Sequence, residues 1–240
     1  MTVNGAAETF ARTVRSFVRR GGRVTRAQAK ALHELWPRFG VDSDGELDLD
    51  ALFARRAPRD LEIGFGMGDA LAALAAAHPE RDFLGVDVHE AGIGRLLALA
   101  DAAGLANLRV LRGDAVVLLR ERLAHAALDG VLIFFPDPWP KKRHHKRRLI
   151  QPGFVALLGS RVKPGGMLHL ATDWAPYAEQ MLQVVEGDGR WLNLAGPGRY
   201  APDAGERPQT RFHSRGERLG HAIFDLLFRR EGSVTGAGCR

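Results

Sequence analysis

Short apolar runs alternate with longer stretches of helical periodicity from residue 59 onwards. The apolar runs predict strands, which we place at residues 60–63, 83–87, 108–111, 130–135 and 167–171. Apolar residues at helical spacing predict helices at residues 70–78, 91–103, 115–123, 153–162 and 175–186. Because each strand is followed by a helix, we expect right-handed βαβ units and a parallel sheet with helices on both faces. Two later strands, near residues 191–195 and 221–228, are expected to complete the sheet.

The first 58 residues show a different pattern. Residues 8–36 predict two basic helical pieces separated at Gly21-Gly22, because glycine is unfavourable inside a helix. Thr25 and Gln28 have the spacing of a capping box, so the second piece is expected to begin there and run toward Trp36-Pro37. Loop and a short hydrophobic anchor are expected up to residue 58. We therefore divide the chain into a basic helical extension (1–58), one α/β domain (59–231) and a flexible tail (232–240).

The composition is that of an ordinary globular protein, with 45% hydrophobic and 26% charged residues in a chain of 240. The longest strongly apolar run, Val131–Phe135, is far shorter than the roughly 20 residues that a membrane span needs. No signal-peptide core follows Met1, and the single cysteine, Cys239, excludes a disulfide framework and a thiolate zinc cluster. These features predict a cytoplasmic protein without a membrane partner.

The net charge of +6 conceals two concentrated basic segments. Residues 9–33 hold seven lysines and arginines and no acid, and residues 141–148 hold six more, again without an acid. The remainder of the chain therefore carries a net charge of −7. Such segments attract polyanions, of which nucleic acid is the commonest in the cytosol. A solvated charged surface is the simpler alternative, but two acid-free segments favour nucleic-acid binding.

A glycine-rich turn follows the first predicted strand, with the sequence Gly64-Phe65-Gly66-Met67-Gly68. Such a turn can merely pack a helix on a strand, or it can let a ligand approach the backbone. A dinucleotide fingerprint would need glycine or alanine where this chain has Asp69, and Glu62 adds a carboxylate before the turn. Two carboxylates repel a pyrophosphate and attract a cation. S-adenosylmethionine carries an ammonium and a sulfonium but no phosphate, so it fits Glu62 and the three glycines.

Further acids stand at the ends of the next two predicted strands. Asp87 closes the second strand, where a carboxylate can bridge ribose hydroxyls. Asp114 follows the third strand, where it can accept a hydrogen bond from an adenine amino group. Each aspartate taken singly is more often a helix N-cap, but acids at successive strand ends predict one pocket at the carboxyl edge of the sheet. The predicted fold is therefore the α/β, Rossmann-like class I fold of S-adenosylmethionine-dependent methyltransferases.

The fourth predicted strand runs into Phe134-Phe135-Pro136-Asp137-Pro138-Trp139-Pro140, directly before the basic residues 141–148. Prolines on both sides make a rigid turn that carries the Asp137 carboxylate. Trp139 offers a ring for base stacking, although a packed tryptophan in a proline-rich turn is the simpler interpretation. His144 and His145 are adjacent and therefore point apart, so we expect no metal site there. The carboxylate, the ring and six cations together fit a nucleic-acid substrate that enters the cofactor pocket.

Several longer segments match one known family. They are S-F-V-R-R (16–20), L-E-I-G-F-G-M-G (61–68), F-F-P-D-P-W-P-K-K-R-H-H-K-R-R (134–148), A-T-D-W-A-P-Y-A (171–178) and R-P-Q-T-R-F-H-S-R-G-E-R-L-G-H (207–221). On these segments the chain resembles the bacterial tRNA (guanine-N7-)-methyltransferases over about residues 15–230. The resemblance implies a seven-stranded, mostly parallel sheet, S-adenosylmethionine as methyl donor, and N7 of a guanine in the tRNA variable loop as acceptor.

The same resemblance implies roles for individual residues. The cofactor positions are Glu62, Asp87, Asp114 and Asp137, of which Asp137 is also the expected catalytic residue. The substrate positions are Lys141, Asp173, Thr210, Arg211, Phe212 and His213. The RNA-contacting positions are Arg143, His144, His145, Lys146, Arg147 and Arg148. Two positions depart from the family, which usually has glutamate at both Asp87 and His213, and a histidine is not a fixed anion at neutral pH.

Two other functions compete with this prediction. An enzyme that methylates an amino group of adenine or cytosine carries the motif D/N-P-P-aromatic, whereas Asp137-Pro138 is followed here by Trp139. A non-catalytic RNA-binding protein on the same fold is disfavoured by the acidic pocket. We expect no metal requirement, and the sequence is compatible with a monomer or a homodimer.

Overall fold

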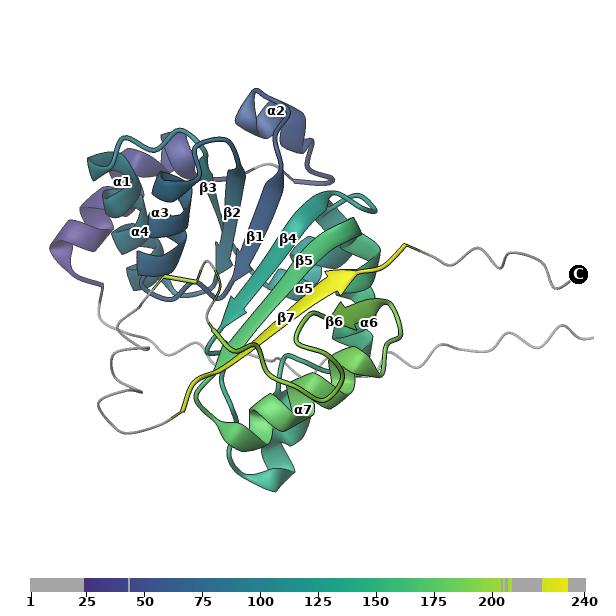
Figure 1. Ribbon diagram of the computed structural model, residues 1–240. Helices are drawn as coiled ribbons and strands as arrows, with labels where there is room; N and C mark the ends of the chain where they lie inside the picture. The colour runs from purple at the N-terminus through teal and green to yellow at the C-terminus, as the bar shows by residue number, and fades with distance from the viewer. Residues whose placement is uncertain (1–23, 43, 204, 206, 209–221, 233–240) are drawn as a thin grey trace, which may run out of the picture.

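The computed structural model describes residues 24–42, 44–203, 205, 207–208 and 222–232, and its centre is a seven-stranded sheet (Figure 1). The strands are β1 (Arg59–Ile63), β2 (Asp82–Asp87), β3 (Leu108–Arg112), β4 (Leu128–Phe134), β5 (Val162–Thr172), β6 (Trp191–Asn193) and β7 (Phe224–Arg230). The α-helices are α1 (Arg26–Phe39), α2 (Leu49–Phe53), α3 (Asp69–Ala77), α4 (Glu90–Ala102), α5 (Ala115–Val117), α6 (Pro152–Arg161) and α7 (Ala175–Glu186). A π-helical turn, η1 (Leu118–Arg122), and a 3₁₀ helix, η2 (Lys142–Arg147), complete the described elements.

The strands lie in the order β3-β2-β1-β4-β5-β7-β6. β1 pairs in parallel with β2 and β4, while β3 and β5 extend the parallel part on either side. β7 runs antiparallel between β5 and β6. The chain order reverses between β1 and β4, and parallel α/β sheets bind ligands at the carboxyl ends of the strands at such a point. The predicted parallel sheet is thus confirmed, and the last two predicted strands form its antiparallel edge.

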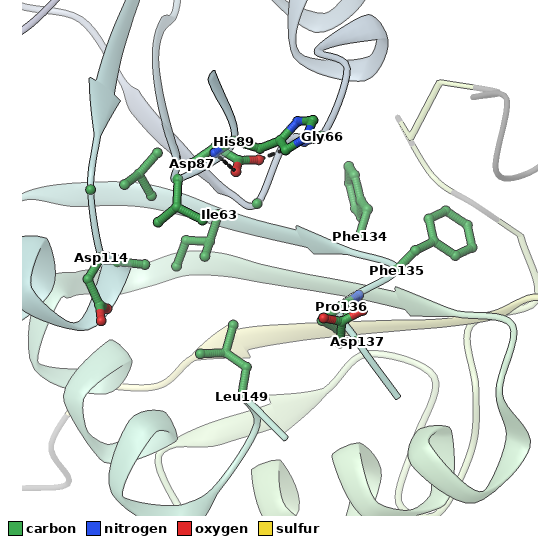
Figure 2. A pocket seen from close by; sticks show the side chains of 15 residues that line it. Ile63, Gly66, Asp87, His89, Asp114, Phe134, Phe135, Pro136, Asp137 and Leu149 are labelled. Atoms are coloured by element: carbon green, nitrogen blue, oxygen red, sulfur yellow. Dashed lines mark hydrogen bonds between the residues drawn. The ribbon is translucent and has the colours of Figure 1, made fainter. Parts of the chain in front are cut away.

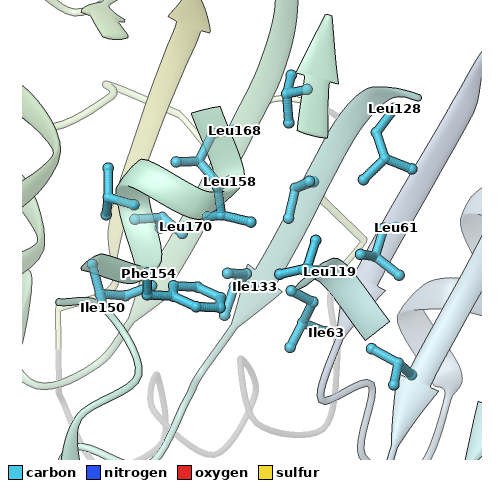
Figure 3. Packing of buried hydrophobic residues seen from close by; sticks show 14 of the residues in the cluster. Leu61, Ile63, Leu119, Leu128, Ile133, Ile150, Phe154, Leu158, Leu168 and Leu170 are labelled. Atoms are coloured by element: carbon cyan, nitrogen blue, oxygen red, sulfur yellow. The ribbon is translucent and has the colours of Figure 1, made fainter. Parts of the chain in front are cut away.

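Alternating strand residues supply two hydrophobic cores, one on each face of the sheet, because successive side chains of a strand point to opposite faces. On one face Leu61 and Ile63 of β1 pack with η1, α6 and α7, and Figure 3 shows Phe154 and Leu158 of α6 in this cluster. On the other face the apolar residues of α3 and α4 pack with Phe83 of β2 and with α1. The two layers of helices hold the strand ends of the central sheet in fixed positions.

The helix α1 begins at the predicted capping box. The Thr25 hydroxyl accepts a hydrogen bond from the Gln28 amide at 3.2 Å, and the Gln28 side chain accepts one from the Thr25 amide at 2.9 Å. The helix reaches Trp36-Pro37 as predicted and continues for two further residues, to Phe39. Phe39 is completely buried in the core beside α4, and that burial offsets the hydrogen bond that a proline removes from a helix.

The first predicted basic helical piece and residues 233–240 of the predicted tail lie outside the described residues. The described part of the predicted extension packs on the sheet: α1 contacts α4 and β3, and the Val41 amide donates to the Val110 carbonyl at 3.0 Å. The division at residue 58 therefore stays a prediction. Among the described helices, none is both long and apolar enough to cross a membrane.

One predicted helix, over residues 115–123, takes a different form. It starts as the single α-helical turn α5 and widens into the π-helical turn η1. The buried side chain of Arg161 donates to the carbonyl groups of Leu119 and Arg120, while Leu118 and Leu119 are completely buried in the core. These long-range contacts, which the local sequence pattern does not contain, account for the distortion.

Candidate active site and nucleic-acid interface

A cavity of about 310 Å³ opens at the carboxyl ends of β1, β2, β3 and β4 (Figure 2). Five of the residues that the sequence proposed for the cofactor line it: Gly64, Gly66, Asp87, Asp114 and Asp137. They come from four separate strand ends, which the sheet order brings together at the switch point. The cavity has the size of a small-molecule site, and the described chain places carboxylates from three of these ends along its wall.

The glycine turn between β1 and α3 has left-handed backbone at all three glycines, but only two of them face the cavity. Gly64 and Gly66 have φ angles of 73° and 57°, and a Cβ atom at either position would meet nothing within 4 Å. The backbone is therefore open to a ligand at these two positions. A Cβ atom at Gly68 would lie 2.6 Å from Cβ of Leu96, so Gly68 allows α3 to pack on α4. The structure thus places Gly68 outside the cavity wall.

Asp87, at the end of β2, holds the glycine turn in position. Its Oδ2 atom accepts a hydrogen bond from the Gly66 amide at 2.9 Å, and its Oδ1 atom accepts one from the His89 amide at 2.9 Å. Burial raises the pKa of the Asp87 carboxyl group above its ordinary value, although hydrogen bonds from the backbone oppose the shift. The aspartate thus uses one oxygen to hold the glycine turn and the other to hold the turn that leads into α4.

Glu62 lies behind the cavity rather than on its wall, because it alternates with Leu61 and Ile63 along β1. The residue is only 2% exposed, and its Oε2 atom has no hydrogen-bond partner. Burial, together with the nearby Asp87 charge, raises the pKa of Glu62 to about 8. Because a buried carboxyl group with an unpartnered oxygen is costly to ionise, a cationic ligand nearby can recover that cost. The observation fits the ammonium group of S-adenosylmethionine.

Asp114 combines two roles at the end of β3. Its Oδ1 atom accepts a hydrogen bond from the Val116 amide at 2.8 Å and so caps α5. The residue also lines the cavity, and Figure 2 shows its carboxylate on the opposite side of the cavity from Asp137. The structural and the ligand-binding interpretations of this aspartate are therefore compatible, because the cap uses one of its two oxygens.

The turn that carries Asp137 is held by arginines at both ends. Phe135 and Trp139 have positive φ angles of 52° and 44°, a backbone conformation that residues other than glycine rarely adopt. The guanidinium of Arg207 lies 5.5 Å from the centre of the Phe135 ring, and that of Arg147 lies 5.0 Å from the centre of the Trp139 ring. The Trp139 ring also meets the edge of His144, so this half-buried tryptophan is packed within its own segment.

The basic residues that follow form the 3₁₀ helix η2 on the surface. Lys141, Arg143, Lys146 and Arg147 are exposed, while His144 and His145 are half-buried. Desolvation and the neighbouring cations lower the pKa of His144, which favours the neutral form of its ring. The helix therefore presents a row of cations with no acid within it, directly after the turn that carries Asp137.

Arg148 is buried, which contradicts the expectation that all six residues from Arg143 to Arg148 contact RNA. It is only 3% exposed, and its guanidinium donates to the Pro138 carbonyl at 2.8 Å and to the Gln180 side chain at 2.6 Å. The residue closes η2 with its side chain turned into the protein, whereas Arg147 remains at the surface. The sequence shows two adjacent arginines that look alike, and only the fold distinguishes them.

Asp173 follows β5 and is half-buried, while Thr210, Arg211, Phe212 and His213 lie outside the described residues. Sequence reasoning missed the residue that anchors this part of the chain, Arg207. Its side chain is 1% exposed and makes two hydrogen bonds of 2.7 Å to Asp225 of β7. Against the effect of burial, hydrogen bonds from Arg207 and His169 lower the pKa of Asp225. Arg207 stands three residues before Thr210, but no local signal marks a partner 18 residues away.

In the part of the chain that the structure describes, no three histidine, cysteine, aspartate or glutamate side chains gather as they would around a metal ion. The polar side chains along the cavity instead include separate carboxylates, and the backbone beside them is open at Gly64 and Gly66. Such a set can hold an organic ligand with hydroxyl, amino and ammonium groups.

Sequence comparison gives one consistent result. Residues 56–226 match a protein-family model with the description "Putative methyltransferase". The chain is 56% identical over 227 residues to a tRNA (guanine-N(7)-)-methyltransferase of Halorhodospira halophila, a match that covers 94% of this chain and 98% of that protein. It is 55% identical over 226 residues to the protein of the same name from Streptomyces avermitilis, covering 94% of this chain and 78% of the relative.

Solved structures show the same fold at low sequence identity. A 16S rRNA methyltransferase, KamB, superposes with a TM-score of 0.58 at 17% identity, covering 81% of this chain and 99% of that chain. A 16S rRNA (adenine(1408)-N(1))-methyltransferase from Catenulisporales acidiphilia, solved with its cosubstrate S-adenosylmethionine, has a TM-score of 0.53 at 19% identity, covering 80% and 95%. The fold is therefore the class I methyltransferase fold that the sequence predicted.

Proposed function

The chain belongs to the tRNA (guanine-N(7)-)-methyltransferase family, and from this premise we propose that it transfers a methyl group from S-adenosylmethionine to N7 of a guanine in the variable loop of tRNA. One observation on this chain's own residues supports the proposal. The cavity with its carboxylates adjoins, through the turn at Asp137, an exposed basic 3₁₀ helix. A cofactor site and an RNA-binding surface are thereby joined within one short segment.

The described residues fit S-adenosylmethionine. On the cavity wall, Asp87 would hold the ribose hydroxyls and Asp114 the adenine amino group. Glu62, behind the wall, would attract the ammonium group through its unpartnered oxygen, and Gly64 and Gly66 leave the backbone open to the ligand. The fit rests on the buried, unpartnered Oε2 atom of Glu62 and on the open space above the two glycines. When bound, the cofactor supplies an electrophilic methyl group. The carboxylates supply a field that favours a cationic ligand and disfavours a pyrophosphate.

The acceptor needs orientation rather than deprotonation. N7 of guanine has an in-plane lone pair and no proton at neutral pH, so no general base is required. The Asp137 carboxylate can hold the N1 and amino donors of the guanine, and it can stabilise the positive charge that develops on the ring. Asp173, which follows β5 at the same sheet edge, would assist, and the exposed Lys141 would bind a phosphate.

The exposed cations of η2 would bind the tRNA backbone, since phosphate contacts position a nucleic acid without reading its sequence. Thr210, Arg211, Phe212 and His213 remain proposed substrate positions on the strength of the family resemblance. We propose that the enzyme acts in the cytoplasm, where it would encounter tRNA.

Product analysis tests the proposed function directly. Purified protein is incubated with S-adenosylmethionine and unmodified tRNA, and the digested RNA is analysed for methylated nucleosides. We expect 7-methylguanosine from the variable loop. An adenine or cytosine methylated on its amino group would show the amino-methylating alternative. Binding of tRNA without any methylation, together with a failure to bind the cofactor, would leave a non-catalytic RNA-binding protein.

The role of Asp137 is tested with Asp137→Asn, which keeps the shape of the side chain and removes its charge. We expect turnover to fall about 10²–10³-fold, the range for losing one preorganised electrostatic group, with little change in tRNA affinity. Cofactor affinity is measured alongside, because Asp137 also lines the cofactor cavity. Near-normal turnover at saturating cofactor would leave substrate geometry alone as the source of catalysis.

A further inference from the structure

The turn between Phe135 and Trp139 is strained at both of its ends. Both residues have left-handed backbone, and Asp137 lies midway between them. A non-glycine residue in this conformation costs roughly 1–3 kcal/mol and persists only where the surrounding structure holds it. The position of the Asp137 carboxylate therefore depends on groups outside the turn.

Arg148 is the group that holds the middle of this turn. Its Nε atom donates to the carbonyl of Pro138, the residue next to Asp137, at 2.8 Å. Its Nη1 atom donates to the Gln180 side chain at 2.6 Å and to the Pro176 carbonyl at 3.3 Å, both in α7. The same guanidinium lies 4.8 Å from the centre of the Tyr177 ring. One buried side chain thus connects the turn after β4 to the first turns of the helix after β5.

This connection spans the two carboxylates that the proposed function places around the guanine. Asp137 precedes Pro138 directly, and Asp173 lies three residues before Pro176. A second contact runs parallel to the first, because the Ile150 amide donates to the Tyr177 hydroxyl at 3.1 Å. The backbone pairing of β4 with β5 sets the distance between the two strand ends, and the guanidinium of Arg148 fastens the turn beyond β4 to the start of α7.

We infer that Arg148 is a positioning residue, which fixes the Asp137 carboxylate relative to Asp173 and does not contact RNA; the inference rests on the proposed function. Its donors are used within the protein: Nε and Nη1 bond to the groups named above, and Nη2 lies 3.1 Å from Nε2 of His145. Arg147 is its matched counterpart, an exposed arginine one residue earlier whose guanidinium rests on Trp139. The two arginines differ in burial and partners, not in chemistry.

The experiment compares Arg148→Gln with Arg147→Gln in the full chain, using unmodified tRNA. The tRNA affinity is measured over a range of salt concentrations, and the single-turnover methylation rate is measured at saturating tRNA and cofactor. Arg147→Gln is expected to weaken tRNA binding and to reduce the slope of log affinity against log salt by roughly 0.7–0.9, the value for one phosphate. Arg148→Gln is expected to leave that slope unchanged and to lower the saturated rate by roughly 10²-fold, as a misplacement of about 1 Å does.

Two further measurements separate positioning from a general loss of structure. Arg148→Lys keeps the charge that a phosphate contact needs but cannot reproduce the fork of donors, so its saturated rate should fall as in the glutamine variant. In Arg148→Gly, added guanidinium chloride should restore part of the rate relative to an equal concentration of sodium chloride, whereas Asp137→Asn should not respond. Cofactor affinity reports whether each variant keeps its folded pocket.

The inference is overturned if Arg148→Gln loses tRNA affinity and salt slope as Arg147→Gln does while its saturated rate is kept. A fully active Arg148→Lys, or a rate in Arg148→Gly that guanidinium does not restore, would also overturn it. Failure of the proposed function looks different, because the unmodified protein would then make no 7-methylguanosine in the same assay.

Discussion

The carboxylates at the two ends of the central strands have opposite environments. At the amino ends, Asp60 of β1 is paired with Arg81 at 2.6 Å, Asp82 of β2 with Arg55 at 2.6 Å, and Asp129 of β4 with Lys163 at 2.8 Å. At the carboxyl ends, neither Glu62, Asp87 nor Asp114 has an ion pair among the described residues. Strand β1 shows both environments within three residues, since Asp60 and Glu62 share one side of it.

The difference separates groups that stabilise the fold from groups that await a ligand. A paired, buried carboxylate is stable as an anion and contributes to folding. An unpaired one is costly to ionise, and a cationic ligand can recover that cost on binding. The ion pairs at the amino ends therefore help to hold the sheet together, while Glu62, Asp87 and Asp114 can gain a cationic partner when a ligand binds; Asp69, which follows the glycine turn, is already paired with Arg95.

The largest effect is expected from Glu62, as a pH dependence of the unliganded protein. The pKa of its carboxyl group is about 8 in the folded state and ordinarily 4.5, so between these pH values the folded protein retains a proton that the unfolded chain releases. With respect to Glu62, the free energy of unfolding is highest below pH 4.5 and falls as the pH rises to about 8. Above about pH 8 it no longer changes with pH. The loss is about 1.4 kcal/mol per pH unit within this window.

Chemical unfolding of the wild type and of Glu62→Gln across the window checks this expectation. The glutamine variant should be the more stable of the two at pH 8, with the difference vanishing near pH 4.5, and it should bind S-adenosylmethionine more weakly. If the wild type and Glu62→Gln were equally stable at both pH values, Glu62 would not differ from the paired carboxylates at the amino ends, and the contrast between the two ends would be wrong.

The second largest effect is expected at the other end of the same strand. Arg81→Ala leaves the buried Asp60 without its two-point partner and should lower the free energy of unfolding by about 3 kcal/mol. This is the lower end of the range for a buried pair, because the Arg81 side chain is 30% exposed. Thermal unfolding measures the loss. Cofactor affinity should be kept in the folded protein, and a weakened affinity without a stability loss would contradict the assignment of this end to the fold alone.

The third prediction separates the two roles of Asp114. Asp114→Ala removes the cap of α5 and the charge, whereas Asp114→Asn keeps a capping side chain and removes only the charge. Both should weaken S-adenosylmethionine binding by about 1.5–3 kcal/mol, the value of a hydrogen bond to a charged group. Only the alanine variant should also lose about 1 kcal/mol of stability. Calorimetric titration gives the affinities, and an unchanged affinity in Asp114→Ala would reject its role in binding adenine.

The smallest effect is expected from an ion pair near the carboxyl ends whose two side chains are exposed to solvent. Glu90 and Arg112 lie 2.8 Å apart, but their side chains are 53% and 57% exposed. Arg112→Ala should change stability by less than about 1 kcal/mol, because solvent screens exposed pairs. A larger loss in thermal unfolding would show that pairing as such, rather than burial, distinguishes the two ends of the sheet.

The strands were predictable because their apolar runs are local, and the helices that alternate with them predicted a parallel sheet; the order of the strands came from the structure. The acids at the strand ends were predictable for the same reason, since the carboxyl ends of parallel strands meet at one edge. Sequence reasoning failed where contacts between residues distant in the chain determine the local backbone structure. The π-helical turn depends on Arg161, and the continuation of α1 through Pro37 depends on the burial of Phe39. Neither partner is visible in the local pattern.

The class of the fold, the acidic strand ends and the basic segment after Asp137 could be predicted from the sequence, because each depends on residues that are close along the chain. Tertiary structure alone decided that Arg147 faces solvent and that Arg148 is buried, that Glu62 lacks a partner, and that Asp60, two residues earlier, has one. The physical reason is that burial and pairing depend on groups that are distant in sequence: Gln180 lies 32 residues from Arg148, and Arg81 lies 21 residues from Asp60.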